Sequence, residues 1–233
     1  MQKISNRGVV LATALLTAAL LAWDVSGLDM ALARISGGSA GFPLQENWFL
    51  NQVLHDGAKR AAWVLVLGLC LAAWWPPAWL KQLDFNRRLQ LAFTPLLAVF
   101  VVSLLKSFST TSCPWALADF GGVAHYSSHW AQLWQPDGGS GRCFPAGHAS
   151  SGFAFVGGYF AWRETSAPIA RRWLALAVLA GFVLGAAQQI RGAHFMSHTL
   201  WTGWICWFVA WAVDSVRVWA GRRGLALRWS DGA

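Results

Sequence analysis

The chain has 233 residues, of which 56% are hydrophobic and only 12% are charged, about half the charged fraction of a soluble domain. This composition excludes an ordinary soluble domain and predicts an integral membrane protein, with residues 1–233 as a single transmembrane domain. The net charge of +8 does not indicate nucleic-acid binding, because the basic residues form short clusters between apolar segments, as orientation signals and contacts with lipid headgroups do.

Six apolar segments follow one another along the chain, and each is expected to form a membrane helix. Several are shorter than the roughly 20 residues of a span, and they reach that length when flanking Trp, Gly, Ser and Thr are included. The first resembles a signal peptide, but the small residues at 31–33 lie too far beyond it for cleavage, so we interpret it as a retained helix. The predicted fold is therefore all-α and polytopic, with six transmembrane helices. They cover approximately residues 9–23, 61–75, 89–105, 148–162, 173–187 and 200–213.

Most basic residues fall on one side of this six-helix layout. The positive-inside rule places that side, with both chain termini, in the cytoplasm. The loops at 24–60, 106–147 and 188–199 then face outward, and we expect a bacterial inner membrane with these loops in the periplasm. The residues on the cytoplasmic side are Lys3, Arg7, Lys81, Arg87, Arg88, Arg163, Arg171, Arg172, Arg217, Arg222, Arg223 and Arg228.

Two of the outward loops carry further patterns. Residues 46–60 form an amphipathic stretch that we expect to lie as a helix on the membrane surface, with gating of a substrate as the alternative role. The loop at 106–148 is long and shows no evident secondary structure, which is typical of functional or disordered segments. Its Trp and Cys content argues against disorder.

A phosphate-binding pattern occurs where this loop enters the fourth apolar segment. Unpaired backbone N–H groups at a helix start receive anions, and Pro145 is tolerated there because its missing N–H costs nothing. Gly147 lets a ligand approach the backbone closely, and His148 titrates near neutral pH. The stretch predicts half of a phosphate site, and the alternative is an ordinary loop-to-helix junction.

The third outward loop carries His194 and His198, four residues apart, with Arg191 three residues before the first histidine. If this stretch is helical, all three side chains share one face. Together with Lys106 and His148, they sit at the outward ends of apolar segments, so the topology gathers five functional side chains at one membrane face.

Histidines and cations at one face suit phosphoryl transfer. One imidazole attacks phosphorus, another protonates the leaving oxygen, and the cations stabilise the negative charge. Zinc is the competing use of the His194 and His198 pair, since the HExxH pattern also places histidines four apart. No glutamate lies between them and no third ligand is evident, so a metal ranks below phosphate.

Three motifs in this order are similar to those of the type 2 phosphatidic acid phosphatase superfamily, PAP2, whose patterns are K-x6-R-P, P-S-G-H and S-R-x5-H-x3-D. The first aligns with residues 106–114, the second with 145–148 and the third with 187–198. The resemblance covers about residues 89–213, and the six-helix layout with outward motifs also resembles the lipid phosphatases of this family.

The resemblance implies a role for each matching residue. His194 would be the nucleophile that forms a phosphohistidine, and His148 the general acid for the leaving group. Lys106 would bind phosphate oxygens, and Gly147 would offer its backbone N–H. No cofactor and no divalent metal is expected. The substrate would be a phosphorylated membrane lipid of the phosphatidic acid, polyprenyl pyrophosphate or lipid A type.

The chain departs from the family pattern at both motif arginines and at the motif aspartate. Cys113 and Gln188 stand in place of arginine, and Arg142 and Arg191 are the nearest cations that would substitute. Small residues also differ, with Ala146 and Ala187 in place of serine.

His198 replaces the aspartate and orients His194 only as a neutral acceptor, a weaker arrangement than a carboxylate. Asp56, Asp119 and Asp137 are left open as carboxylates that would reach the site.

Four cysteines divide into two kinds. Cys70 and Cys206 lie inside apolar helices and are expected to pack as small hydrophobic residues. Cys113 and Cys143 belong to the two motif segments that must converge on one phosphate, in an oxidising compartment if the outward assignment holds. We therefore predict a disulfide between them, with two free thiols as the alternative.

The predicted function is a lipid phosphate or pyrophosphate phosphatase acting at the outward face. A lipid-to-lipid phosphotransferase differs only in whether water or a lipid hydroxyl takes the phosphoryl group. A non-catalytic lipid-binding or transport protein on the same helices is the alternative from another class, because the motif departures are compatible with lost hydrolysis.

Overall fold

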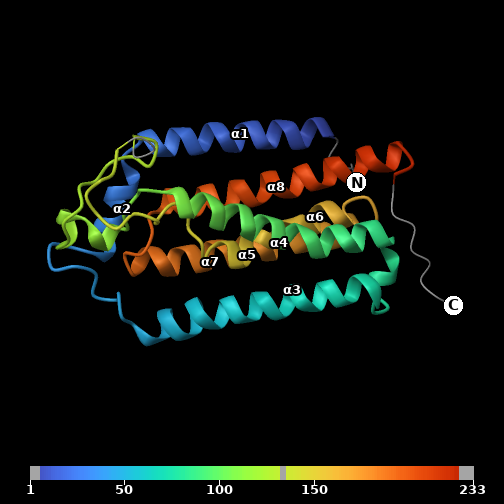
Figure 1. Ribbon diagram of the computed structural model, residues 1–233, viewed down its shortest axis with the longest axis horizontal. Helices are drawn as coiled ribbons and strands as arrows, with labels where there is room; N and C mark the ends of the chain where they lie inside the picture. Colours follow the sequence, from blue (N-terminus) through green and yellow to red (C-terminus); the bar gives the residue numbers. More distant parts are fainter. Residues whose placement is uncertain (1–5, 132–134, 226–233) are drawn as a thin grey trace.

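The computed structural model describes residues 6–131 and 135–225. Within these residues the fold is helical and contains no β-strand. Short 3-10 turns, at Leu80–Gln82, Pro114–Ala116, Ala118–Phe120 and Ala154–Val156, connect the longer elements. The longer elements, labelled in Figure 1, are α1 (Asn6–Val25), α2 (Leu28–Ser36), the π-helical η1 (Phe49–Gly57), α3 (Ala58–Trp74), α4 (Phe85–Phe108), α5 (Ser150–Phe153), α6 (Gly157–Trp162), α7 (Ala167–Ile190) and α8 (Met196–Arg222).

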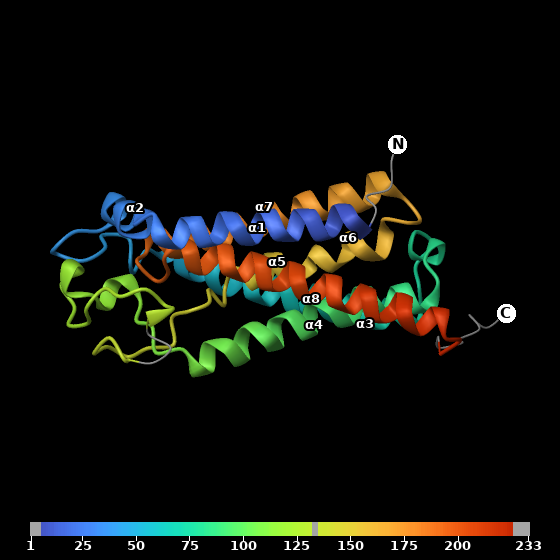
Figure 2. The same ribbon diagram turned by 90° about the horizontal axis from the view of Figure 1, so that it is seen from above.

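The long helices run side by side along one axis of the molecule (Figures 1 and 2). α1 and α3 lie on opposite outer sides in Figure 1, while α5 and α6 lie inside the bundle against α4, α7 and α8. Phe160, Ala161 and Trp162 are fully buried there. On the outer helices, large apolar side chains such as Leu11, Val64 and Phe100 are exposed, as lipid-facing positions are expected to be.

Four helices within the described residues are long and apolar enough to cross a membrane: residues 7–25, 49–74, 85–108 and 167–190. The two other predicted spans fall on α8 and on the broken helix from α5 to α6. α8 has 27 residues but carries Asp214 and two arginines near its end. Six spans and a cytoplasmic location of both termini stay predictions.

The long loops gather at one end of the bundle. In Figures 1 and 2 this end holds α2 and the connections before α3 and before α5, whereas α1 begins and α8 ends at the opposite end. At that opposite end the buried carboxylate of Asp214 accepts hydrogen bonds from Gln90 (3.1 Å), Arg163 (2.7 Å) and Arg217 (3.0 Å). Pairing offsets the large cost of burying a charge.

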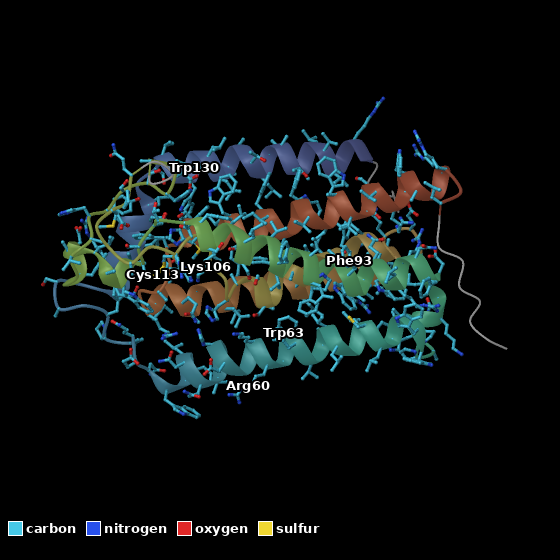
Figure 3. All side chains as sticks on the ribbon, in the orientation of Figure 1. Arg60, Trp63, Phe93, Lys106, Cys113 and Trp130 are labelled. Atoms are coloured by element: carbon cyan, nitrogen blue, oxygen red, sulfur yellow. A yellow bond between two sulfur atoms is a disulfide. The ribbon has the colours of Figure 1, made fainter. Side chains whose placement is uncertain are left out.

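Two carboxylates near the α1–α2 junction fasten the loop-rich end. The Oδ2 atom of Asp24 accepts from the indole N–H groups of Trp130 (2.7 Å) and Trp201 (3.0 Å). The Oδ1 atom of Asp29 accepts from the backbone N–H of Ser197 in the first turn of α8 (2.9 Å). Figure 3 shows Trp130 at this end of the molecule. These contacts hold α1, the long loop and the start of α8 together.

Two interpretations of the sequence need correction. Residues 46–60 do not form a separate surface helix, because η1 continues directly into α3 through Gly57 in right-handed helical geometry. The stretch at 188–198 is not one helix either. α7 ends at Ile190, and α8 begins only at Met196. Gly192 between them has a φ of 75°, and a Cβ there would lie 2.3 Å from the Phe42 ring, so only glycine fits this turn.

Candidate active site

The first two motif segments are joined covalently. The predicted disulfide between Cys113 and Cys143 is confirmed, with 5.2 Å between the Cα atoms. Two backbone hydrogen bonds run alongside it, from Arg142 N–H to the carbonyl of Ser109 (2.8 Å) and from Cys143 N–H to the carbonyl of Thr111 (2.9 Å). Lys106 therefore reaches the same loop-rich end that holds Cys113 (Figure 3).

His194 and His198 lie side by side although they do not share one helix. His194 is in the turn before α8 and His198 is in the first turn of α8, and both are buried. Their Nδ1 atoms are 3.5 Å apart, at the outer limit of a hydrogen bond, and the tautomers of the two rings decide which nitrogen would donate. His198, at the motif aspartate position, is thus the ring partner of His194.

The sulfur of Cys143 completes this cluster. It lies 3.5 Å from Nδ1 of His194 and 2.8 Å from the carbonyl oxygen of Ala193. A disulfide sulfur has no hydrogen to donate, so the second distance is a close contact and not a hydrogen bond. Cys143, His194 and His198 also form the one group of metal-ligand donors found among the described residues, with all three donor atoms within 4.8 Å of one another.

The second motif is fastened to α8 through its backbone. The N–H of Ala146 donates to the carbonyl of His198 (3.2 Å), and the hydroxyl of Thr202 is shared between the carbonyls of Ala146 (3.1 Å) and His198 (2.8 Å). Lys106 faces the same motif, since a Cβ placed on Gly147 would lie 3.6 Å from its Nζ atom. The glycine leaves room between the ammonium group and the loop backbone.

His148 has a neighbour that the sequence analysis did not assign to the site. The ring of His55, from η1, packs against it with 3.6 Å between ring centroids and a tilt of 32° between the ring planes. Nδ1 of His55 lies 2.7 Å from Oδ1 of Asp56, and Nδ1 of His148 is buried with no hydrogen-bond partner among the described residues. The only sequence signal for His55 was its position in the amphipathic stretch, which we interpreted as a surface helix.

Burial keeps both candidate catalytic imidazoles uncharged. Loss of hydration, followed by the nearby charges of His55, Lys106, Lys59 and Arg191, lowers the pKa of His148 to about 3. Burial and the charge of Lys106 also hold the pKa of His194 well below 6.5. A neutral imidazole suits a nucleophile, whereas a general acid must gain a proton, which an anionic substrate beside His148 would favour.

The two candidate substitute arginines are placed differently. The guanidinium group of Arg191 donates to the carbonyl of Gln45 (2.9 Å) and to the side chain of Gln188 (3.1 Å), and its charge acts on His148. The side chain of Arg142 is exposed, on a residue with a φ of 58°. Of these two arginines, Arg191 is therefore the one whose charge reaches His148.

The three aspartates that the sequence left open as site carboxylates lie in different places. Asp137 is used inside the loop, where it accepts from the backbone N–H and the hydroxyl of Ser112, both at 2.7 Å. Asp119 pairs with Arg34 at 3.1 Å on the surface. Only Asp56 lies beside a site histidine, through its contact with His55.

A cavity of about 330 Å³ begins at His148 and runs between α3 and α4. Polar groups line one end of it, at Lys59, Gly147 and His148. The remainder is apolar and is lined by Trp63, Val66, Leu96, Val99 and Phe155. A second cavity of about 500 Å³ on the other side of α3 shares Ala62, Ser151 and Phe155 with the first. The site therefore has an ionic end and an apolar groove.

This histidine, lysine and arginine cluster at the loop-rich end of a helical bundle is of the kind that binds and transfers phosphate. Comparison with known families agrees: the family described as the PAP2 superfamily matches residues 87–222. The chain belongs to the PAP2 superfamily, whose activity is of the phosphatase type on phosphorylated substrates. Searches of curated proteins and of solved structures find no match.

Proposed function

We propose that this protein is a membrane-bound phosphatase that removes phosphate from a lipid phosphate or pyrophosphate at the outward, periplasmic face of a bacterial inner membrane. The observation that carries the proposal is the cavity with His148 and Lys59 at one end and apolar side chains along the rest. A phosphate group and a hydrocarbon chain on one molecule match these two ends.

In the proposed mechanism, His194 attacks phosphorus through Nε2 while its Nδ1–H is donated to Nδ1 of His198. The bond from phosphorus to the leaving oxygen breaks, and protonated His148 gives its proton to that oxygen. Lys106, Arg191 and the backbone N–H of Gly147 hold the phosphate oxygens as charge develops. Water then attacks the phosphohistidine, His148 takes its proton, and phosphate leaves.

The site lacks the family's carboxylate, and this sets an expectation for rate. A neutral imidazole acceptor stabilises the developing imidazolium less than an anion does, so turnover should be slow. Replacing His198 with Asp should therefore raise kcat. A fall in kcat with unchanged folding would show that His198 has a role that a carboxylate does not fill.

Phosphate release from detergent-solubilised protein tests the proposal, with phosphatidic acid, a polyprenyl pyrophosphate and a lipid A-type phosphate as substrates and a short soluble phosphate ester for comparison. Val99→Trp, which fills the groove, should raise KM for long-chain lipids and leave hydrolysis of the short ester unchanged. Phe93→Trp, on the exposed far part of α4 (Figure 3), is the matched control. Equal effects of Val99→Trp on both substrate types would exclude the groove as a lipid site, and absence of release from every substrate would favour a non-catalytic lipid-binding protein.

A lipid-to-lipid phosphotransferase is the second candidate, and the second cavity favours it. Two apolar grooves flank α3 and share lining residues near the start of α5, which is the arrangement that a donor lipid and an acceptor lipid require. Thin-layer chromatography of labelled lipid phosphate with a lipid alcohol present distinguishes the two reactions, since transfer gives a labelled second lipid and hydrolysis gives labelled inorganic phosphate.

A further inference from the structure

The cluster of Cys143, His194 and His198 has the spacing of a metal site. Nδ1 of His194 is 3.5 Å from Nδ1 of His198 and 3.5 Å from the sulfur of Cys143. In a tetrahedral zinc site, bond lengths of about 2.0–2.3 Å place neighbouring nitrogen and sulfur ligands roughly 3.3–3.6 Å apart. The two measured distances fall in this range, and all three donors are buried.

A fourth ligand is already next to the cluster, because the sulfur of Cys113 is bonded to the sulfur of Cys143. As a disulfide, these two atoms are poor metal ligands, since zinc binds the thiolate. Reduction converts them into two thiols beside two histidines, which is the Cys₂His₂ set of structural zinc sites. Cys143 is buried whereas Cys113 is partly exposed, so a reductant has access to the bond from the Cys113 side.

We propose that reduction of the Cys113–Cys143 disulfide creates a zinc site made of these two cysteines, His194 and His198. A dithiol reductant supplies two electrons and two protons, is itself oxidised to a disulfide, and leaves two thiols on the protein. Zinc then displaces the two thiol protons, and the sulfur atoms separate to the roughly 3.7 Å of neighbouring tetrahedral thiolates.

The same site would control catalysis, and this part rests on the proposed function. A neutral imidazole that binds zinc through Nδ1 carries its hydrogen on Nε2. The Nε2 of His194 then has no lone pair with which to attack phosphorus. The oxidised protein is therefore the active form, and the reduced, zinc-loaded protein is inactive.

Cobalt absorption tests the site without reference to turnover. Purified full-length protein in detergent is titrated with Co²⁺ before and after reduction by a trialkylphosphine, which takes oxygen from water as it reduces the disulfide. The reduced protein should bind one equivalent with the visible bands of tetrahedral sulfur and nitrogen ligation, and Zn²⁺ should abolish the bands. The oxidised protein should show none.

Two variants separate the site from other thiols and from misfolding. The double variant Cys113→Ala/Cys143→Ala keeps the two other cysteines, Cys70 and Cys206. Loss of an outer-sphere partner lowers metal affinity by roughly 10–100-fold, and the double variant should bind Co²⁺ more weakly than that, because it loses two direct ligands. Cys113→Ala alone frees the Cys143 thiol, so it should bind Co²⁺ with no reductant present. Tight Co²⁺ binding by the double variant would overturn the proposal, and so would absence of the tetrahedral bands from folded Cys113→Ala. The test of Cys113→Ala needs no reductant, so it holds even if reduction unfolds the wild-type chain.

Discussion

Binding of a phosphate-like dianion should transfer a proton to His148. In the free protein the pKa of this imidazole is about 3, so at pH 7 it is uncharged. Raising this pKa to 7 requires about 5 kcal/mol, at 1.36 kcal/mol for each pKa unit. A charge pair about 4 Å apart contributes about 4 kcal/mol at an effective dielectric constant of 20, so the two charges of a dianion supply about 8 kcal/mol. The attraction of the dianion for protonated His148 exceeds the free energy needed to raise the pKa to 7, so the complex should take up close to one proton at pH 7.

The direction in which pH changes the affinity for the dianion follows from the difference in the pKa of His148 between the free protein and the complex. The pKa of His148 is raised in the complex, so the complex binds more protons than the free protein between pH 3 and the raised pKa. The affinity for the dianion should therefore increase as the pH falls through the raised pKa, and it should level off near pH 3.

Sulfate is the ligand of choice because it stays a dianion throughout this range. Isothermal titration calorimetry at pH 7, in buffers with different ionisation enthalpies, gives the number of protons taken up for each sulfate bound. We expect about one for the wild type and close to none for His148→Asn. Sulfate binding without proton uptake, or the same uptake in His148→Asn, would refute the reasoning and remove His148 as the group protonated by substrate.

Three further predictions concern the other groups of the site. His194→Ala should abolish phosphate release and His148→Ala should reduce it severely, with the double variant little worse than His194→Ala because the two act as a unit; near-normal turnover of folded His194→Ala would exclude the phosphohistidine. Arg191→Lys should lower kcat/KM about tenfold, since lysine copies the planar contact of arginine with phosphate poorly, and unchanged kinetics would remove this assignment. Mass spectrometry after alkylation without reduction should find Cys113 and Cys143 unlabelled, and loss of the bridge should lower stability by about 2–4 kcal/mol; labelling of both as free thiols would contradict the disulfide.

The sequence predicted the elements whose signals are local. Runs of apolar residues located the long helices, although α7 begins six residues before its predicted segment and α8 ends nine residues after its own. The disulfide was also predictable, because two motifs that bind one phosphate must approach each other and each carries a cysteine. Motif spacing placed Lys106, His148 and His194 at one end of the bundle.

Other features depended on tertiary packing that spacing does not encode. His55 reaches His148 only because η1 extends the N-terminal end of α3 in place of a separate surface helix. The contact of Cys143 with His194 depends on the turn at Gly192, which brings α7 and α8 together without a continuous helix. Arg142 and Arg191 were both candidate substitutes in the sequence, and only the structure shows that the side chain of Arg142 is exposed.

The most direct test of the proposed phosphatase is to trap the covalent intermediate. The protein is incubated briefly with lipid phosphate labelled in its phosphoryl group, quenched in alkali, digested and analysed by mass spectrometry under conditions that preserve phosphohistidine. We expect an acid-labile, alkali-stable phosphoryl group on His194, absent from His194→Ala. Phosphate release from the labelled lipid with no phosphoryl group on His194, or with the group on another residue, would contradict it.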